Sequence, residues 1–262
     1  QYDIADYLQN GPRRLCVQAF RGVGKSWITS AFVCHRLLLN PNNNILVISG
    51  SKQRADDFST FTLRLIEEMP ILQHLRPRDN QRNSKIAFDV GPAQASHAPS
   101  VTSRGITGQI TGARADLIVA DDVESLNNSM TQTMRDKLAE SIKEFDAVLK
   151  PDGRIAYLGT PQTEYSIYTA LPQRGYDTRI WTARYPDEKT FNNLSDRLSP
   201  KIIEIMEQDP DVVGKPTDPK RFDDMDLMER EASYGRSGFA LQFMLDTSLS
   251  DVGRYPLKLS DL

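Results

Sequence analysis

The chain has 262 residues, of which 39% are hydrophobic and 26% are charged, and its formal net charge is −3. This length and composition suit one globular domain, or a core domain with a small appendage. The acidic balance excludes a globally basic nucleic-acid-binding protein, so any DNA contact must come from local patches. No apolar run approaches the roughly 20 residues of a membrane helix, and no membrane partner is expected.

The two ends and the cysteines carry weaker signals. The first residues are polar and include Asp, which argues against a signal peptide. Because the chain does not begin with Met, we expect it to be part of a longer protein. Cys16 and Cys34 fall in a predicted strand and a predicted helix, so we expect buried, reduced thiols.

Residues 1–8 predict a short helix that begins with Gln1 and Tyr2. Gln1 lies 24 residues (25 − 1) before Lys25. Helicase-like ATPases place an adenine-reading Gln at a similar distance before the phosphate loop. A Gln amide matches the N6–H donor and the N7 acceptor of adenine, and Tyr2 could pack on the base. The alternative is that both are ordinary surface residues near a chain end.

Residues 15–39 read as a short apolar strand, a glycine loop and an amphipathic helix, which is the context of a phosphate-binding loop. There Lys25 would reach the β- and γ-phosphates of ATP, and Ser26 would hold Mg²⁺. The helix N-terminus adds about +0.5 of a charge. The consensus opens with Gly where this chain has Ala19, and Arg21 lies within reach of a γ-phosphate. The predicted ATP-binding residues are Gln1, Tyr2, Ala19, Phe20, Arg21, Gly22, Val23, Gly24, Lys25, Ser26 and Trp27.

Strands and helices alternate after the loop. Residues 45–49 predict a buried strand, residues 51–69 a long helix and residues 85–90 a further strand. This order indicates a parallel sheet with right-handed crossovers. The later elements expected are helices at residues 131–149 and 165–171 and strands at residues 154–158 and 177–183.

The strongest signal after the loop is an apolar strand that ends in carboxylates, at Asp121, Asp122 and Glu124. In P-loop enzymes an acid at the end of a neighbouring strand holds Mg²⁺, and a second acid polarises the attacking water. Asp121 is the natural metal partner, and either Asp122 or Glu124 is the candidate for the water. Strand alternation separates Asp121 from the other two unless the chain turns. The alternative is an acidic N-cap cluster before the next helix.

Three more residues are candidates for the chemistry. Thr160 follows a predicted strand in the stretch GTPQ, where a hydroxyl could hydrogen-bond near the γ-phosphate, although a plain turn explains the stretch equally well. Arg104 and Arg114 border a mobile Gly- and Thr-rich segment before the acids. They are candidates for an arginine finger given to a neighbouring subunit. The alternative is that Arg114 pairs with Asp116 or another acid.

The composition changes after Pro186. Charged helices are expected at residues 201–208 and 223–234, and an apolar stretch at residues 238–245. We therefore predict a core at residues 1–186 and a lid or linker segment at residues 187–262, whose C-terminal helix docks on the core.

Four motifs stand in order: R-x-x-G-K-S, then G-x-R-A-D running into an apolar A-D-D-V-E strand, then L-G-T-P-Q, then F-x-x-Q-F. With these motifs the chain resembles the ATPase domain of a tailed-phage terminase large subunit, closest to the podovirus type, also called DNA maturase B. The stretches VQAFRGVGKSWIT, GITGQITGARAD and YLGTPQ carry the similarity, which covers nearly the whole chain. Many terminases have Asp-Glu where this chain has Asp121-Asp122, which leaves the catalytic acid open.

The resemblance implies an α/β P-loop NTPase of the RecA-like (ASCE) type, with a mostly parallel sheet flanked by helices and a small helical lid. It implies Mg²⁺-dependent ATP hydrolysis that drives double-stranded DNA, held transiently, into the capsid. The partners implied are a homo-pentameric ring, the phage portal and a terminase small subunit, in the host cytoplasm on the procapsid. The residues carried over are Arg21, Gly24, Lys25 and Ser26 in the loop, Asp121 on Mg²⁺, Asp122 or Glu124 as catalytic acid, and Thr160 as coupling residue.

Two other functions fit the same motifs. A helicase-type DNA-dependent ATPase shares their order but normally needs two RecA-like domains. A nucleotide-binding docking module would bind ATP without turnover. The terminase family continues into an RNase H-like nuclease domain, and we expect no nuclease activity from this chain because it ends near the linker.

Overall fold

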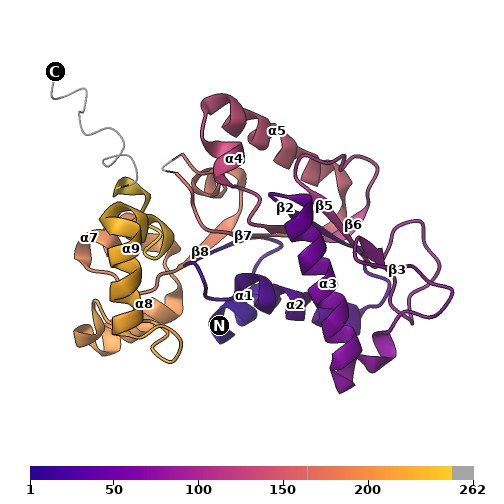
Figure 1. Ribbon diagram of the computed structural model, residues 1–262, viewed down its shortest axis with the longest axis horizontal. Helices are drawn as coiled ribbons and strands as arrows, with labels where there is room; N and C mark the ends of the chain where they lie inside the picture. Colours follow the sequence, from indigo (N-terminus) through magenta and orange to yellow (C-terminus); the bar gives the residue numbers. More distant parts are fainter. Residues whose placement is uncertain (164, 250–262) are drawn as a thin grey trace. The chain divides into compact units, whose positions relative to one another are not determined.

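The computed structural model describes residues 1–163 and 165–249. It holds one eight-stranded sheet with the order β3-β4-β5-β2-β6-β7-β1-β8 (Figure 1). The strand β2 runs parallel to β5 and β6, and β6 runs parallel to β7, whereas β3 and β4 pair antiparallel at one edge. The predicted α/β class with a mostly parallel sheet is confirmed. The strands are β1 (Arg14–Ala19), β2 (Ile45–Ser49), β3 (Asn83–Ser84), β4 (Ala87–Phe88), β5 (Val101–Gly105), β6 (Ala115–Asp121), β7 (Leu149–Gly159) and β8 (Asp177–Trp181).

Most of the connections between the strands are helical. The α-helices are α1 (Tyr2–Asn10), α2 (Lys25–Leu39), α3 (Lys52–Glu68), α4 (Leu126–Ser129), α5 (Gln132–Val148), α6 (Ile167–Ala170), α7 (Glu188–Leu194), α8 (Pro200–Gln208) and α9 (Asp224–Gln242). Short 3-10 helices are η1 (Pro70–Leu75), η2 (Pro172–Arg174), η3 (Ser195–Arg197), η4 (Pro210–Val212) and η5 (Thr247–Leu249). None of the helices that the structure describes is long and apolar enough to cross a bilayer.

The chain divides into two compact units. The first unit holds residues 1–15 and 24–158, and the second holds residues 16–23 and 159–262. In the first unit, α1, α2 and α3 lie on one face of the strands and α5 lies on the other (Figure 1). Right-handed crossovers explain this, because α2 and α3 carry the chain across the sheet in one direction and α5 carries it back.

Strand register aligns the polar ends of the first unit. Ser49 at the end of β2 lies beside Asp121 at the end of β6, and Asp121 lies beside Leu158 of β7. Before these ends the strands are apolar and buried, for example Leu117 to Ala120 of β6 and Ile45 to Ile48 of β2. A strand buried on both faces has no polar alternation, which is why these two strands were predictable from sequence.

In the second unit, the C-terminal segment packs against β8 and the residues around it. The Phe20 N–H donates to the Trp181 carbonyl at 3.0 Å, and the Ala183 N–H donates to the Phe243 carbonyl at 2.8 Å. Phe239 stacks on Phe243 with ring centroids 5.0 Å apart. The strand predicted at residues 177–183 is confirmed as β8, and Trp181 at its end is buried.

Two local predictions were wrong in detail. Residues 85–90 do not form one strand, because Lys85 and Ile86 make the turn of a hairpin between β3 and β4. Their alternating pattern fitted a strand, but β4 instead pairs antiparallel with β5 and ends after Phe88. The strand expected at residues 154–158 begins earlier, at Leu149. It includes the Pro-Asp-Gly stretch at residues 151–153, with Asp152 at φ 63°.

Two further predictions concern the cysteines and the domain boundary. Cys16 and Cys34 are free thiols, and burial raises the pKa of each from 9.0 to about 12. The buried, reduced state is thus confirmed.

A core at residues 1–186 with a lid segment at residues 187–262 remains a prediction, and residues 250–262 of that segment lie outside the described residues.

Candidate nucleotide-binding site

The predicted phosphate loop connects β1 to α2. β1 ends at Ala19 and α2 begins at Lys25. Gly22 and Gly24 both adopt φ 92°, a left-handed conformation that strongly favours glycine. Gly24 is the N-cap of α2 and has no side chain to cap the helix, so the first turn of the helix is not capped by its own residue. A helix N-terminus of this kind attracts anions such as phosphate.

The hydroxyl of Ser26 lies against the carboxylate of Asp121. Ser26 Oγ is 3.1 Å from Asp121 Oδ1 and 3.0 Å from Oδ2, although 95 residues separate the two in sequence. Ser26 lies in the first turn of α2 and Asp121 is the last residue of β6. The fold therefore brings together the two residues that the sequence predicts as metal ligands.

Asp121 lies in an unusual electrostatic environment. Burial first, and then the nearby charge of Asp122, raise the pKa of Asp121 from 3.8 to about 7. The Ser26 hydrogen bond and the charges of Lys25 and Arg54 act in the opposite direction. A buried carboxylate of this kind is stabilised by an added cation, because a cation offsets both the desolvation and the repulsion.

The chain turns immediately after Asp121. Asp122 has φ 43°, a left-handed conformation that is uncommon outside glycine. Its N–H donates to the Leu158 carbonyl at 2.8 Å, and its carbonyl accepts from the Gly50 N–H at 3.1 Å. The strand alternation that would have separated the acids therefore ends at Asp121.

The two candidates for the water-activating acid differ in exposure. Asp122 is half-buried, whereas the side chain of Glu124 is only 2% exposed. The alternative reading as an acidic N-cap cluster is wrong, because the residues at the N-caps of α4 and α5 are Ser125 and Thr131.

Thr160 is hydrogen-bonded to Ala19, the residue at which the phosphate loop begins. Its hydroxyl donates to the Ala19 carbonyl at 3.0 Å, and its own carbonyl accepts from the Gln162 amide at 2.9 Å. Thr160 is buried and follows β7 directly after Gly159. A Cβ on Gly159 would come within 2.1 Å of the Tyr168 ring, so only glycine fits the approach to Thr160.

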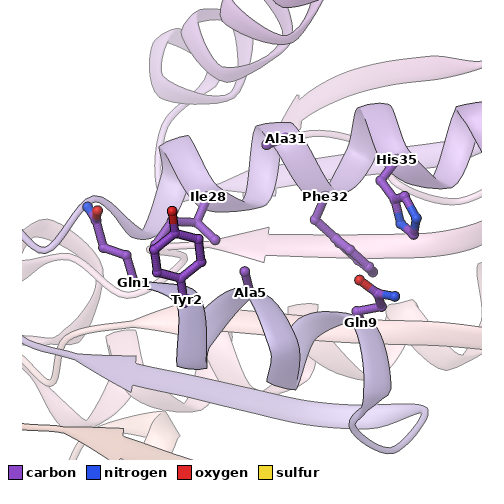
Figure 2. A pocket seen from close by; sticks show the side chains of 8 residues that line it. All are labelled: Gln1, Tyr2, Ala5, Gln9, Ile28, Ala31, Phe32 and His35. Atoms are coloured by element: carbon purple, nitrogen blue, oxygen red, sulfur yellow. The ribbon is translucent and has the colours of Figure 1, made fainter. Parts of the chain in front are cut away.

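The predicted adenine-reading residues line a pocket of about 450 Å³ between α1 and α2. Gln1 and Tyr2 lie at one end of it beside Ile28, which is one turn from Lys25 in α2 (Figure 2). Tyr2 is 94% exposed, so its ring is free to cover a ligand. Trp27 lies elsewhere, because its ring packs against Phe61 of α3 with centroids 4.3 Å apart.

The three candidate arginines have different surroundings. Arg21 is exposed, and its N–H donates to the Gln242 carbonyl at 3.0 Å. Arg104 donates to the Gln109 carbonyl of its own loop. Arg114 is exposed and contacts only the adjacent Ala113 carbonyl, with no carboxylate partner among residues 1–163 and 165–249. The suggested pairing of Arg114 with Asp116 is wrong.

Asp116 has other partners, Lys150 at 2.9 Å and the Asn44 N–H at 2.7 Å. The structure also brings in residues that motif reasoning missed. Arg54, in the first turn of α3, acts electrostatically on Asp121. Arg221 donates to two carbonyls of the phosphate loop. No sequence motif marks either arginine.

The fold and site define a RecA-like P-loop domain, and comparison with known proteins identifies the family. The family model for the N-terminal part of the T4likevirus-type terminase large subunit matches residues 18–145. The terminase large subunit of Enterobacteria phage T3 is 50% identical over 267 residues, which span 100% of this chain and 46% of that relative. The chain belongs to the terminase large subunit family, and the resemblance read from its motifs is confirmed.

Solved structures share the fold. The large terminase ATPase domain of Thermus phage P74-26 is 13% identical with a TM-score of 0.50, and the match covers 92% of this chain and 91% of that one. An arginine mutant of that domain is 12% identical with a TM-score of 0.51, covering 93% and 92%. Among the curated relatives, the chain spans about half the length of the phage T3 protein that it matches.

The raised pKa of Asp121 predicts an unusual pH dependence in metal-free buffer. Between about pH 4 and pH 7, folded Asp121 keeps a proton that the unfolded chain has released, so the unfolded state binds fewer protons and stability falls as pH rises. The Asp121→Asn variant carries no such proton. We expect its melting temperature to rise relative to the wild type between pH 4.5 and pH 7 in EDTA. Parallel melting curves would contradict the raised pKa.

Proposed function

We propose that this chain is the Mg²⁺-dependent ATPase domain of a packaging motor that drives double-stranded DNA into a phage procapsid. The observation that carries the proposal is the contact of Ser26 with Asp121 beside the phosphate loop. A hydroxyl from the loop helix and a carboxylate from a neighbouring strand are the Mg²⁺ ligands of P-loop enzymes. ATP is the substrate that the loop and the cation would hold together.

The residues present fit Mg²⁺ bound together with phosphates. Ser26 and Asp121 supply oxygen ligands, and the Asp121 carboxylate is buried. Mg²⁺ typically takes one or two protein carboxylates and completes its shell with phosphates and water. Bound there, Mg²⁺ would neutralise charge on the β- and γ-phosphates.

The side chains of the site would then have different roles in ATP hydrolysis. Lys25, at the start of α2, would pair with the β- and γ-phosphates, and the exposed Arg21 would reach the γ-phosphate. Asp122 would orient the attacking water. Its exposure and its left-handed backbone favour it over the buried Glu124, because strained backbone concentrates at functional positions.

Thr160 would couple hydrolysis to movement. Its hydroxyl bond to the Ala19 carbonyl links the end of β7 to the residue where the phosphate loop begins. A change in the conformation of the loop on loss of the γ-phosphate would alter this hydrogen bond. The residue is buried, so the bond is shielded from competing water.

The pocket between α1 and α2 would receive the adenine base. It is lined by apolar side chains of α2 with Gln1 and Tyr2 at the end nearest Lys25 (Figure 2). Its volume of about 450 Å³ is ample for a purine. Gln9 and His35 lie at the other end of the pocket (Figure 2).

Membership in the family supports the motor role. We propose a homo-pentameric ring of this domain, docked on the portal of a procapsid in the host cytoplasm, with a terminase small subunit as partner. Contact with DNA would be transient, which fits the net charge of −3, because a motor must release each phosphate it holds.

The first test is ATP hydrolysis per chain as a function of protein concentration, with Lys25→Ala as the blank. We expect a Lys25-dependent rate that rises with concentration, because an arginine finger from a neighbouring subunit would complete each site. Arg114→Ala should remove most of that rise, a loss of about 10³-fold or more, whereas Arg104→Ala should retain it.

Three outcomes would contradict parts of this scheme. A rate equal to that of Lys25→Ala would exclude an ATPase and favour a nucleotide-binding docking module. A flat, Lys25-dependent rate would place the finger within one chain, with Arg21 the candidate. An unchanged rise in Arg114→Ala would remove Arg114 as the finger.

The catalytic acid can be tested with two isosteric variants. We expect Asp122→Asn to lower kcat about 10²- to 10⁴-fold while ATP still binds, because only the water-orienting carboxylate is lost. Glu124→Gln should lower kcat far less. Single-turnover hydrolysis and ATP titration measure the two effects separately. The reverse order of the two variants would assign the water to Glu124.

The adenine pocket predicts a change in nucleotide preference. Gln1→Ala should reduce the preference for ATP over GTP about tenfold, because a Gln amide pairs with the N6 and N7 edge of adenine alone. Gln9→Ala removes the same amide at the other end of the pocket and should leave the preference unchanged. Competition binding with ATP and GTP measures it. Equal effects of the two variants would exclude the base from the Gln1 end.

A further inference from the structure

Arg221 holds the phosphate loop from the segment predicted to be the lid. Its Nη1 donates to the Val23 carbonyl at 2.8 Å, and its Nη2 donates to the Gly22 carbonyl at 3.0 Å. These contacts span 198 and 199 residues of sequence. Hydrogen bonds from a guanidinium are charge-assisted, and its planar fork fixes both acceptors in direction as well as distance. The Asp218 carboxylate lies 3.9 Å from the same Nη1.

The next residue supports the same part of the loop. The Phe222 ring packs edge-on against Phe20, with centroids 5.2 Å apart. A Cβ built on Gly22 would lie 3.0 Å from the tip of that ring, so Phe222 lies directly against the loop. Arg230 stacks over Phe222 at 5.2 Å and is itself paired with Asp226. Arg221 and Phe222 therefore form one anchored contact on the loop.

The two carbonyls that Arg221 binds belong to peptide planes with a second function. In a trans peptide the C=O and the N–H point in opposite directions. The Gly22 carbonyl shares its plane with the Val23 N–H, and the Val23 carbonyl shares its plane with the Gly24 N–H. Fixing both carbonyls on Arg221 therefore directs both N–H groups away from the guanidinium.

The Gly24 N–H is available for a ligand. The Val23 N–H donates to the Phe20 carbonyl at 3.4 Å. The Gly24 N–H donates no hydrogen bond to any residue that the structure describes. Backbone N–H groups of a phosphate loop are the groups that bind phosphate oxygens.

We propose that Arg221 is a positioning residue of the nucleotide site, which orients the phosphate-binding N–H groups of the loop through their carbonyls. The inference rests on the proposed function, because it assumes that the loop binds ATP. It also makes the lid segment and ATP binding mutually dependent, since a group that favours the binding-competent loop is favoured in turn by the ligand. Gln242 adds a second point of attachment through its carbonyl bond with the Arg21 N–H.

The test compares Arg221→Met with Lys220→Met by titration with Mg²⁺ and ATP. Lys220 is exposed and makes no hydrogen bond or ion pair in the described part of the chain, so its variant removes the same charge one residue away. We expect Arg221→Met to bind ATP about tenfold more weakly, and Lys220→Met to stay within about twofold of the wild type. Arg221→Lys keeps the charge without the fork and should lie between them.

A second measurement distinguishes a positioning role of Arg221 from a general loss of structure around the loop. Mg²⁺ with inorganic pyrophosphate carries phosphate groups without a base, and adenosine carries the base without phosphates. Competition by pyrophosphate should weaken in Arg221→Met by the same factor as ATP binding, while competition by adenosine should not change. Equal weakening of both competitors would assign Arg221 a purely structural role and overturn the proposal.

The remaining outcomes are also decisive. A folded Arg221→Met chain that binds ATP as well as Lys220→Met would overturn the proposal. If circular dichroism shows that Arg221→Met does not fold, Arg221→Lys decides, and wild-type affinity in that variant would overturn it. A wild-type chain whose ATP binding does not depend on Lys25 would overturn the proposed function itself. Lys25-dependent binding with no effect of Arg221 would overturn this inference alone.

Discussion

The contact between Ser26 and Asp121 is the interaction on which the site depends. It exists because β6 lies between β2 and β7, which brings its carboxyl end to the edge where the helix α2 begins. One hydroxyl cannot compensate a buried carboxylate, and burial together with Asp122 raises the pKa of Asp121 to about 7. Without a cation, the buried Asp121 carboxylate lowers the stability of the fold. A bound cation would offset that loss. Under the proposed function, this loss of stability is the consequence of keeping a buried carboxylate ready for Mg²⁺.

Backbone hydrogen bonds hold the residues around this contact. Asp122 is fixed through its own N–H and carbonyl to Leu158 and Gly50, and Thr160 is fixed to the Ala19 carbonyl. Two of these bonds join main-chain groups, which need hydrogen-bond partners when folding removes them from water. None of these bonds uses a carboxylate oxygen of Asp121 or Asp122. A site organised in this way can change its ligand without losing the contacts that shape it.

The phosphate loop is held in the same manner. Arg221 binds the carbonyls of Gly22 and Val23, and the Gln242 carbonyl binds the Arg21 N–H. Both partners come from the C-terminal third of the chain, so the loop's geometry depends on residues far from it in sequence. Under the proposed function, this dependence would let the state of the nucleotide and the state of the predicted lid segment affect one another.

The sequence alone determined the buried strands, the phosphate loop, the carboxylate cluster and the family, because apolar runs and short motifs are local. It could not decide between Asp122 and Glu124, since that depends on the turn after Asp121 and on burial. It also could not show that residues 85–90 fold into a hairpin, because their pattern fits a strand until β5 offers a partner. Arg54 and Arg221 carry no motif at all. Only the tertiary structure brings them to the site, because electrostatic and hydrogen-bonding partners are set by distance in space and not along the chain.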